Sequence, residues 1–394
     1  MRTSINKGVK LTLALASMLF AVHCSTSKKN EIVGQSEWSE KMQELSQVIS
    51  ELFPFILSKE EFQNEKNFSE IEKNVKKLSE LAHNVNAKSI KESPDADPAV
   101  QFLAKGFDAE IAKAYDALHT GHREYSRQVL AVATNHCINC HSRSGAGPQS
   151  KTLNLNFDYV KLNPFVRAEI YAATRQFTKA IDEYRALLKE KEFVVQYPFE
   201  VERALKKALA IYIRVLNDPD NAKKFIADFL ALPDLPHFLK RQAKVWAKDL
   251  DNLSRDGSRK LVMRGAYKKT MDRLIADAQR RESNIEFDSP LVNYLRATAL
   301  GHEYFTRIKK DQVFPEMLFN MGMCYESLQD LGYWTLHEDY YTRCIQERPH
   351  SEIADRCYNR LEQSIYLGYT GSAGTRIPPD VRAQLVKLKD MARQ

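Results

Sequence analysis

Apolar residues recur every three or four positions through most of this chain, a period typical of helices with one buried face. Four such patterns come first, at residues 38–56, 67–85, 98–118 and 122–141. Asn67 and Glu70 have the spacing of a capping box, and Asp97 before Pro98 is a cap followed by a proline in the first turn. Because the connections are short, residues 36–147 are predicted to form an antiparallel four-helix bundle.

Helical patterns continue in the second half of the chain. Residues 144–151 are rich in Gly, Pro and Ser and predict a linker, and the linker between the two domains is placed at residues 148–156. Further helices are predicted at residues 198–216, 221–232, 237–253, 261–282, 290–307 and 379–393. The predicted fold class is therefore all-α.

Two segments of the second half resemble tetratricopeptide repeats. Ala168, Tyr171, Phe177, Ala180 and Tyr184 occupy the small and aromatic positions of that repeat. Small residues allow the two helices of a hairpin to touch, and the aromatic residues fill the space beside them. Residues 320–349 follow the same pattern with a short insertion. The resemblance implies a tetratricopeptide-like α-solenoid over residues 157–394; the alternative is an irregular helical domain with two coincidental matches.

The composition agrees with a helical protein. Gly and Pro number only 14 each, and 28% of residues are charged against 43% hydrophobic. The formal net charge of +7 is spread along the chain, without a basic block interleaved with aromatic residues. Nucleic acid is therefore not expected as a partner.

The fourth helical pattern ends in Cys137-Ile138-Asn139-Cys140-His141, the spacing at which a c-type haem is attached. Two thiols at this spacing form thioethers with the two vinyl groups of one porphyrin, and the next residue supplies an imidazole to the iron. On a helix, Cys137, Cys140 and His141 project from one face. Zinc would need four ligands, and no second Cys or His pair at finger spacing follows. A thioredoxin-like motif would need a βαβ context, which the pattern does not show.

A helical bundle whose last helix carries this motif resembles the class II, or c′-type, cytochromes. The resemblance covers residues 36–147 and implies one covalent haem c in the bundle core, with His141 as the proximal iron ligand. Low-spin members supply a methionine from the first helix, and Met42 lies on that helix's apolar stripe. Met42 is thus a candidate distal ligand, and core filling is the alternative.

Other polar side chains near the motif are weaker candidates. His83, His119 and His122 are expected at the surface or at helix ends. His136 points roughly 100° away from Cys137 around a helix, so it does not reach the iron easily. Arg143 is a candidate partner for a haem propionate, and a solvated arginine is the alternative.

The N-terminus predicts export. Residues 1–23 combine a basic start with an apolar run from Leu11 to Val22 that is too short to span a membrane, as in a signal peptide. Cys24 follows, as at a bacterial lipoprotein cleavage site, although His23 and Ala21 depart from the usual box. This resemblance implies lipidation of Cys24, a linker over residues 24–35 and a membrane anchor. The expected location is the periplasm or the outer membrane, since c-type haem is attached outside the cytoplasm.

Three further cysteines lie in the second half. In an oxidising compartment Cys344 and Cys357 are predicted to pair, and Cys324 has the character of a small buried residue.

The sequence thus predicts a periplasmic monohaem cytochrome that transfers one electron between redox partner proteins, with a further protein partner on its helical half. An electron carrier is favoured over an enzyme, because the second half contains no catalytic constellation. Two alternatives remain. A five-coordinate haem would bind a small gas or peroxide, and a structural haem would leave the solenoid as a scaffold in an envelope complex.

Overall fold

The computed structural model describes residues 33–92, 97–145, 162–255, 264–282, 289–308 and 310–393. Within these ranges the regular secondary structure is helical apart from one hairpin of two-residue strands, which confirms the all-α class. Cys24 and the predicted signal peptide lie outside the described residues. The elements in chain order are α1 (Val33–Ile56), α2 (Lys59–Gln63), η1 (Glu65–Asn67), α3 (Phe68–Glu92), α4 (Ala99–His119), α5 (Arg123–His141), α6 (Pro164–Ala173), α7 (Phe177–Leu188), α8 (Lys191–Gln196), α9 (Pro198–Ala210), η3 (Ile211–Val215), α10 (Pro219–Leu230), α11 (His237–Arg255), α12 (Arg264–Glu282), α13 (Leu291–Arg307), α14 (Phe314–Glu326), η5 (Gln329–Leu331), α15 (Leu336–Glu347), α16 (Glu352–Gly368), β1 (Thr370–Gly371), β2 (Gly374–Thr375) and α17 (Pro379–Ala392).

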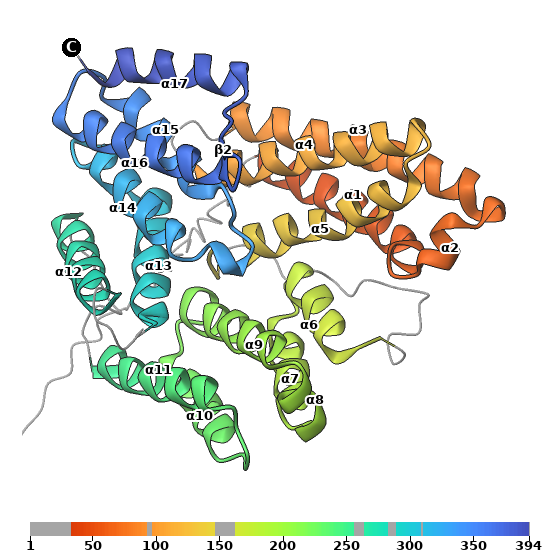
Figure 1. Ribbon diagram of the computed structural model, residues 1–394, viewed down its shortest axis with the longest axis horizontal. Coiled ribbons are helices and arrows are strands. Elements are labelled where there is room, and N and C mark those ends of the chain that lie inside the picture. Colours follow the sequence, from red (N-terminus) through yellow and green to blue (C-terminus); the bar gives the residue numbers. More distant parts are fainter. Residues whose placement is uncertain are drawn as a thin grey trace, which may run out of the picture.

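Helices α1, α3, α4 and α5 lie side by side at one end of the molecule (Figure 1). Their apolar stripes meet in a core of their own, which includes Leu52, Val75, Ala114 and Leu130. Arg127, in the second turn of α5, donates from Nη1 to the carbonyl of Ile56 at the end of α1 over 2.7 Å. The last carbonyls of a helix lack partners within it, and Arg127 satisfies one of them. Because the contact joins the end of α1 to the beginning of α5, the two neighbouring helices run antiparallel.

The remaining helices pack largely as neighbouring hairpins around a second, larger core (Figure 1). Small residues allow close approach within it. A Cβ on Gly322 of α14 would lie 2.3 Å from the Tyr341 ring of α15, and one on Gly301 would meet the Met321 sulfur. The second core also takes in Ala99, Leu103 and Ile138 from α4 and α5, so the two groups of helices share a buried boundary.

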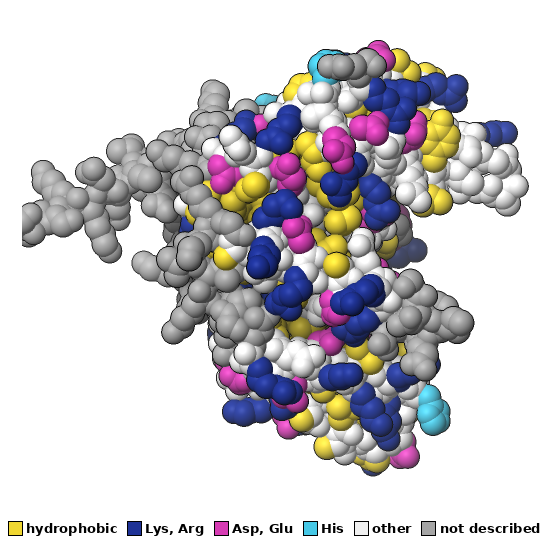
Figure 2. Space-filling view, turned by 90° about the vertical axis from the view of Figure 1, so that its left-hand side faces the viewer, with side chains coloured by type: hydrophobic (Ala, Val, Ile, Leu, Met, Phe, Trp, Pro, Cys, Tyr) yellow, Lys and Arg dark blue, Asp and Glu magenta, His cyan; other side chains and the backbone are white. Residues whose placement is uncertain are grey.

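The surface charge is mixed. Figure 2 shows Lys and Arg side chains interspersed with acidic and apolar ones on the face that carries α12 and α16. None of the described helices is both long and apolar enough to cross a bilayer.

Candidate functional site

The Cys-x-x-Cys-His motif forms the last turn of α5, where the two cores meet. Cys137 packs against the bundle core and Cys140 against the larger core, and both thiols are free. The two residues between them point into the second half: Ile138 is buried there, and the Asn139 Nδ2 donates to the Gly332 carbonyl over 2.9 Å. The motif is therefore held in part by a residue 193 positions away in sequence.

His141 is oriented by a backbone carbonyl. Its Nδ1 lies 2.5 Å from the Ala173 oxygen, and because a carbonyl only accepts, Nδ1 carries the proton. Ala173 is the last residue of α6, so its carbonyl is one that the helix leaves unpaired. Burial lowers the pKa of His141 to about 4. The imidazole is thus neutral at pH 7, and its Nε2 lone pair is available.

The turn after α6 also holds the end of α5. Arg175 adopts a left-handed backbone with φ of 61°. Its guanidinium donates to the carbonyls of His141 and Gly145, each over 3.3 Å. This places a cation beside the end of the motif, at the helix terminus whose dipole favours positive charge.

The motif lies at the end of the bundle core, where that core borders the second half. The buried residues of α5 in the bundle core are Val129, Leu130 and Ala133, which lie about one to two turns before the motif. Towards its end α5 also packs against α6, and the His141 Nδ1 faces the carbonyl of Ala173, the last residue of that helix. The last turn of α5 therefore lies at the boundary with the second half.

Met42 lies at the level of His141. Ile56 of α1 and Arg127 of α5 are in contact, and the two helices run antiparallel from that point. Met42 lies fourteen residues before Ile56, and His141 lies fourteen residues after Arg127. Both helices rise about 1.5 Å per residue, so the two residues lie within about a turn of the same height. The Met42 side chain is partly buried against the bundle core, as is that of Cys137.

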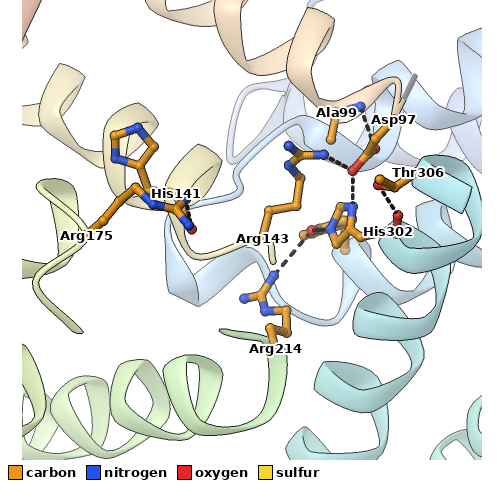
Figure 3. Close-up of polar contacts among 9 residues, drawn as sticks. Asp97, Ala99, His141, Arg143, Arg175, Arg214, His302 and Thr306 are labelled. Atoms are coloured by element: carbon orange, nitrogen blue, oxygen red, sulfur yellow. Dashed lines mark hydrogen bonds and ion pairs between the residues drawn. The ribbon is translucent and has the colours of Figure 1, made fainter. Parts of the chain in front are cut away.

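Arg143 has a partner within the chain. Its Nη1 pairs with the buried Asp97 carboxylate, whose other contacts are the His302 Nδ1 at 2.7 Å and the Ala99 amide at 3.1 Å. Figure 3 shows this cluster on one side and the His141 ring pointing away from it. The structure therefore pairs Arg143 with an acid of the chain itself, and the side chain is not a solvated arginine. Its Nε is buried without a hydrogen-bond partner, and the propionate contact stays a prediction.

The cluster continues into the second half as a chain of hydrogen bonds. The His302 Nε2 lies 2.6 Å from the Tyr325 hydroxyl, which is 3.3 Å from Nη1 of Arg214 in η3 (Figure 3). Burial lowers the pKa of His302 to about 4, so its ring is neutral at pH 7. The Arg143 guanidinium and His302 together hold the pKa of Asp97 near 2, despite its burial.

The other histidines near the motif lie apart from it. His83 and His119 are largely exposed and face Asp108 and Glu72, respectively. His122 precedes α5 and contacts the Thr120 hydroxyl. His136 is packed against α4, where a Cβ on Gly106 would come within 2.8 Å of its ring.

The three cysteines of the second half divide into a pair and a single thiol. Cys344 of α15 and Cys357 of α16 form a disulfide. Cys324 is free and buried within α14.

The side chains of the motif suit a covalent haem. Among the described residues, no group of three or more His, Cys, Asp or Glu side chains gathers as a metal site. A haem needs no such group, because the porphyrin supplies four ligands to the iron. Two free thiols and one neutral imidazole on a single helical face, with its second nitrogen anchored to a carbonyl, are the donor set that a c-type haem requires.

Comparisons with known proteins add no assignment. The sequence matches no known protein family and no curated protein, and the fold matches no solved structure.

Proposed function

We propose that the chain is a monohaem c-type cytochrome that transfers single electrons between protein partners. The observation that carries this proposal is the state of His141, with Nδ1 bonded to the Ala173 carbonyl and a free lone pair on Nε2, beside two free thiols. Iron-ligating histidines characteristically donate their other ring nitrogen to such an acceptor. When bound, the haem would supply an iron that cycles between the ferric and ferrous states.

The chain's own residues have distinct tasks in this proposal. Cys137 and Cys140 hold the haem by thioethers, and Ala173 fixes the tautomer and direction of the His141 ring. Arg175 places a positive charge beside the motif. The first four long helices correspond to a class II cytochrome bundle and the second half to a tetratricopeptide-like solenoid, whose surface would bind a partner protein.

Export is part of the proposal. The Cys344–Cys357 disulfide supports it, since disulfides persist mainly in oxidising compartments. The basic and apolar start of the sequence supports a signal peptide, and Cys24 supports a lipid anchor.

The first test is an optical spectrum of the purified protein, oxidised and reduced, with and without carbon monoxide. Covalent haem is expected to remain with the chain in denaturing electrophoresis, and to be lost from Cys137→Ser/Cys140→Ser. A protein matured in a host that attaches c-type haem but carries none would overturn the proposal.

Met42 as the distal ligand is tested separately. Met42→Ala should convert a low-spin spectrum that carbon monoxide leaves unchanged into a high-spin one that carbon monoxide shifts. Ile49→Ala removes a neighbouring apolar side chain two turns further along the same helix, and should leave the spectrum unchanged. A wild-type haem that binds carbon monoxide at once would instead favour gas or peroxide binding.

A further inference from the structure

A small cavity lies behind the motif, on the face of α5 opposite to Cys137 and His141. Among the described residues, the polar side chains that line it are Asn139, Ser142, Tyr184, Lys207, Arg214 and Tyr333. Each can donate a hydrogen bond and none is a carboxylate. Its remaining wall is apolar. Such a lining selects against cations.

Arg214 brings an unbalanced charge to this cavity. Its side chain is 4% exposed, and its Nε and Nη2 are buried without a hydrogen-bond partner. Its contacts are two phenols: the Tyr325 hydroxyl at 3.3 Å from Nη1, and the Tyr333 ring, whose centroid lies 5.1 Å from the guanidinium carbon. Neither carries a negative charge in its ordinary state.

The neighbouring charges do not compensate Arg214. Asp97 balances Arg143, and His302 between Asp97 and Tyr325 is neutral. Lys207, on the other side of the cavity, is balanced by Glu169. Tyr325 would balance the charge only by losing its proton, and burial raises its pKa well above the ordinary value. One buried positive charge therefore remains, which destabilises the fold if nothing neutralises it.

We propose that this cavity binds one small monovalent anion of the size of chloride, held by the two unpaired N–H groups of Arg214. The cavity offers ≈ 10 Å³ to a water-sized body, about the space of a single heavy atom. This size favours a monatomic anion over carboxylates and phosphate. The proposal is independent of whether the chain carries haem, because the cavity lies on the other face of α5.

Thermal unfolding of the purified full-length protein tests this site. The unfolding midpoint should be higher in sodium chloride than in sodium gluconate of equal ionic strength, because an anion that binds only the folded state stabilises it. The difference should grow with chloride concentration and saturate. Arg214→Gln should abolish the difference. Arg280→Gln removes an equal charge from an exposed side chain and should retain it, which corrects for general salt effects.

A second variant covers the case in which Arg214→Gln fails to fold. Ala210→Val adds two methyl groups at the cavity wall while keeping Arg214. It should lose both the chloride-dependent midpoint and the chloride-dependent broadening of the ³⁵Cl resonance that we expect for the wild type. Equal midpoints in the two salts for the wild type would overturn the proposal, as would a chloride effect that survives in Arg214→Gln or Ala210→Val.

Discussion

His302 is fully buried between an acid and a phenol, so acid should act on the protein through this residue. The groups that face it are Asp97 and Tyr325, with Arg143 and Arg214 behind them. Its pKa in the fold is about 4, against 6.5 for a free histidine. The unfolded chain therefore binds a proton first. The stability that the neutral ring contributes is present above pH 6.5 and is lost as the pH falls towards 4.

We predict that the free energy of unfolding falls on acidification from pH 6.5 to 4.5, with His302 contributing about 3 kcal/mol at most. Urea unfolding at several pH values measures this. His302→Gln should show a shallower dependence on pH, whereas the contribution of His337, whose pKa is also lowered to about 4, is common to both proteins. Parallel curves for the two proteins would show that His302 does not titrate as inferred.

At the scale of single residues, the sequence predicted the motif but not the side chains that surround it. The spacing of Cys137, Cys140 and His141 alone places them on one helical face. Asp97 and His302 are 205 residues apart, and nothing local to either position signals their contact. Asp97 was predicted only as a helix cap, a role it also has through the Ala99 amide. Arg214 gave no signal, because a buried arginine is indistinguishable in sequence from a solvated one.

At the scale of elements, close contact between α14 and α15 depends on Gly322. Gly322→Ala should lower the free energy of unfolding by about 2 kcal/mol, because the new methyl group would overlap the buried Tyr341 ring, which Glu326 holds by a 2.7 Å hydrogen bond. Gly368→Ala, near the end of α16, meets no atom within 4 Å and should be neutral or stabilising by up to about 1 kcal/mol. Chemical unfolding of both variants gives the comparison. If Gly322→Ala and Gly368→Ala had the same free energy of unfolding, the overlap with Tyr341 would be relieved without cost and the prediction would be wrong.

The disulfide between α15 and α16 closes a short loop. Cys344→Ala/Cys357→Ala should destabilise the protein by about 2–4 kcal/mol, because the unfolded chain regains freedom that the bond removes. The pairing is checked by alkylating unfolded protein without reductant: Cys324 should react, and Cys344 and Cys357 should not. Alkylation of all three would refute it.

The sequence predicted most of the long helices to within a few residues, because an apolar stripe over three or more turns is unambiguous. It missed the long helix α16, the short elements α2 and α8, the hairpin β1–β2 and the π-helical turn η3. Five or six residues carry too little periodicity to distinguish a helix from a loop. A π turn differs from an α-helix by one hydrogen-bond step, which leaves no mark on the pattern.

At the scale of the whole molecule, the buried boundary should make the two groups of helices unfold together. Among the described residues, Asp97 is the acid that pairs with both Arg143 and His302, and it joins the start of α4 to α13. Asp97→Ala should cost about 3–5 kcal/mol, because Arg143 is left buried without a counter-charge. Calorimetry should show one transition for the wild type and a broadened or split one for the variant.

Asp116→Ala, an exposed acid on α4, should change stability by less than about 0.5 kcal/mol. A similar loss in both variants would contradict this role of Asp97.

The position of the motif also bears on the order in which the chain would fold and acquire a covalent group. Ile138 and Asn139 are enclosed by the second half, and His141 is covered by α6, which follows the motif by more than twenty residues. An enzyme that joins vinyl groups to Cys137 and Cys140 would need this segment unfolded or only partly docked. For a chain that carries haem, attachment would therefore precede the docking of α6, after which Cys137 and Cys140 are only partly exposed.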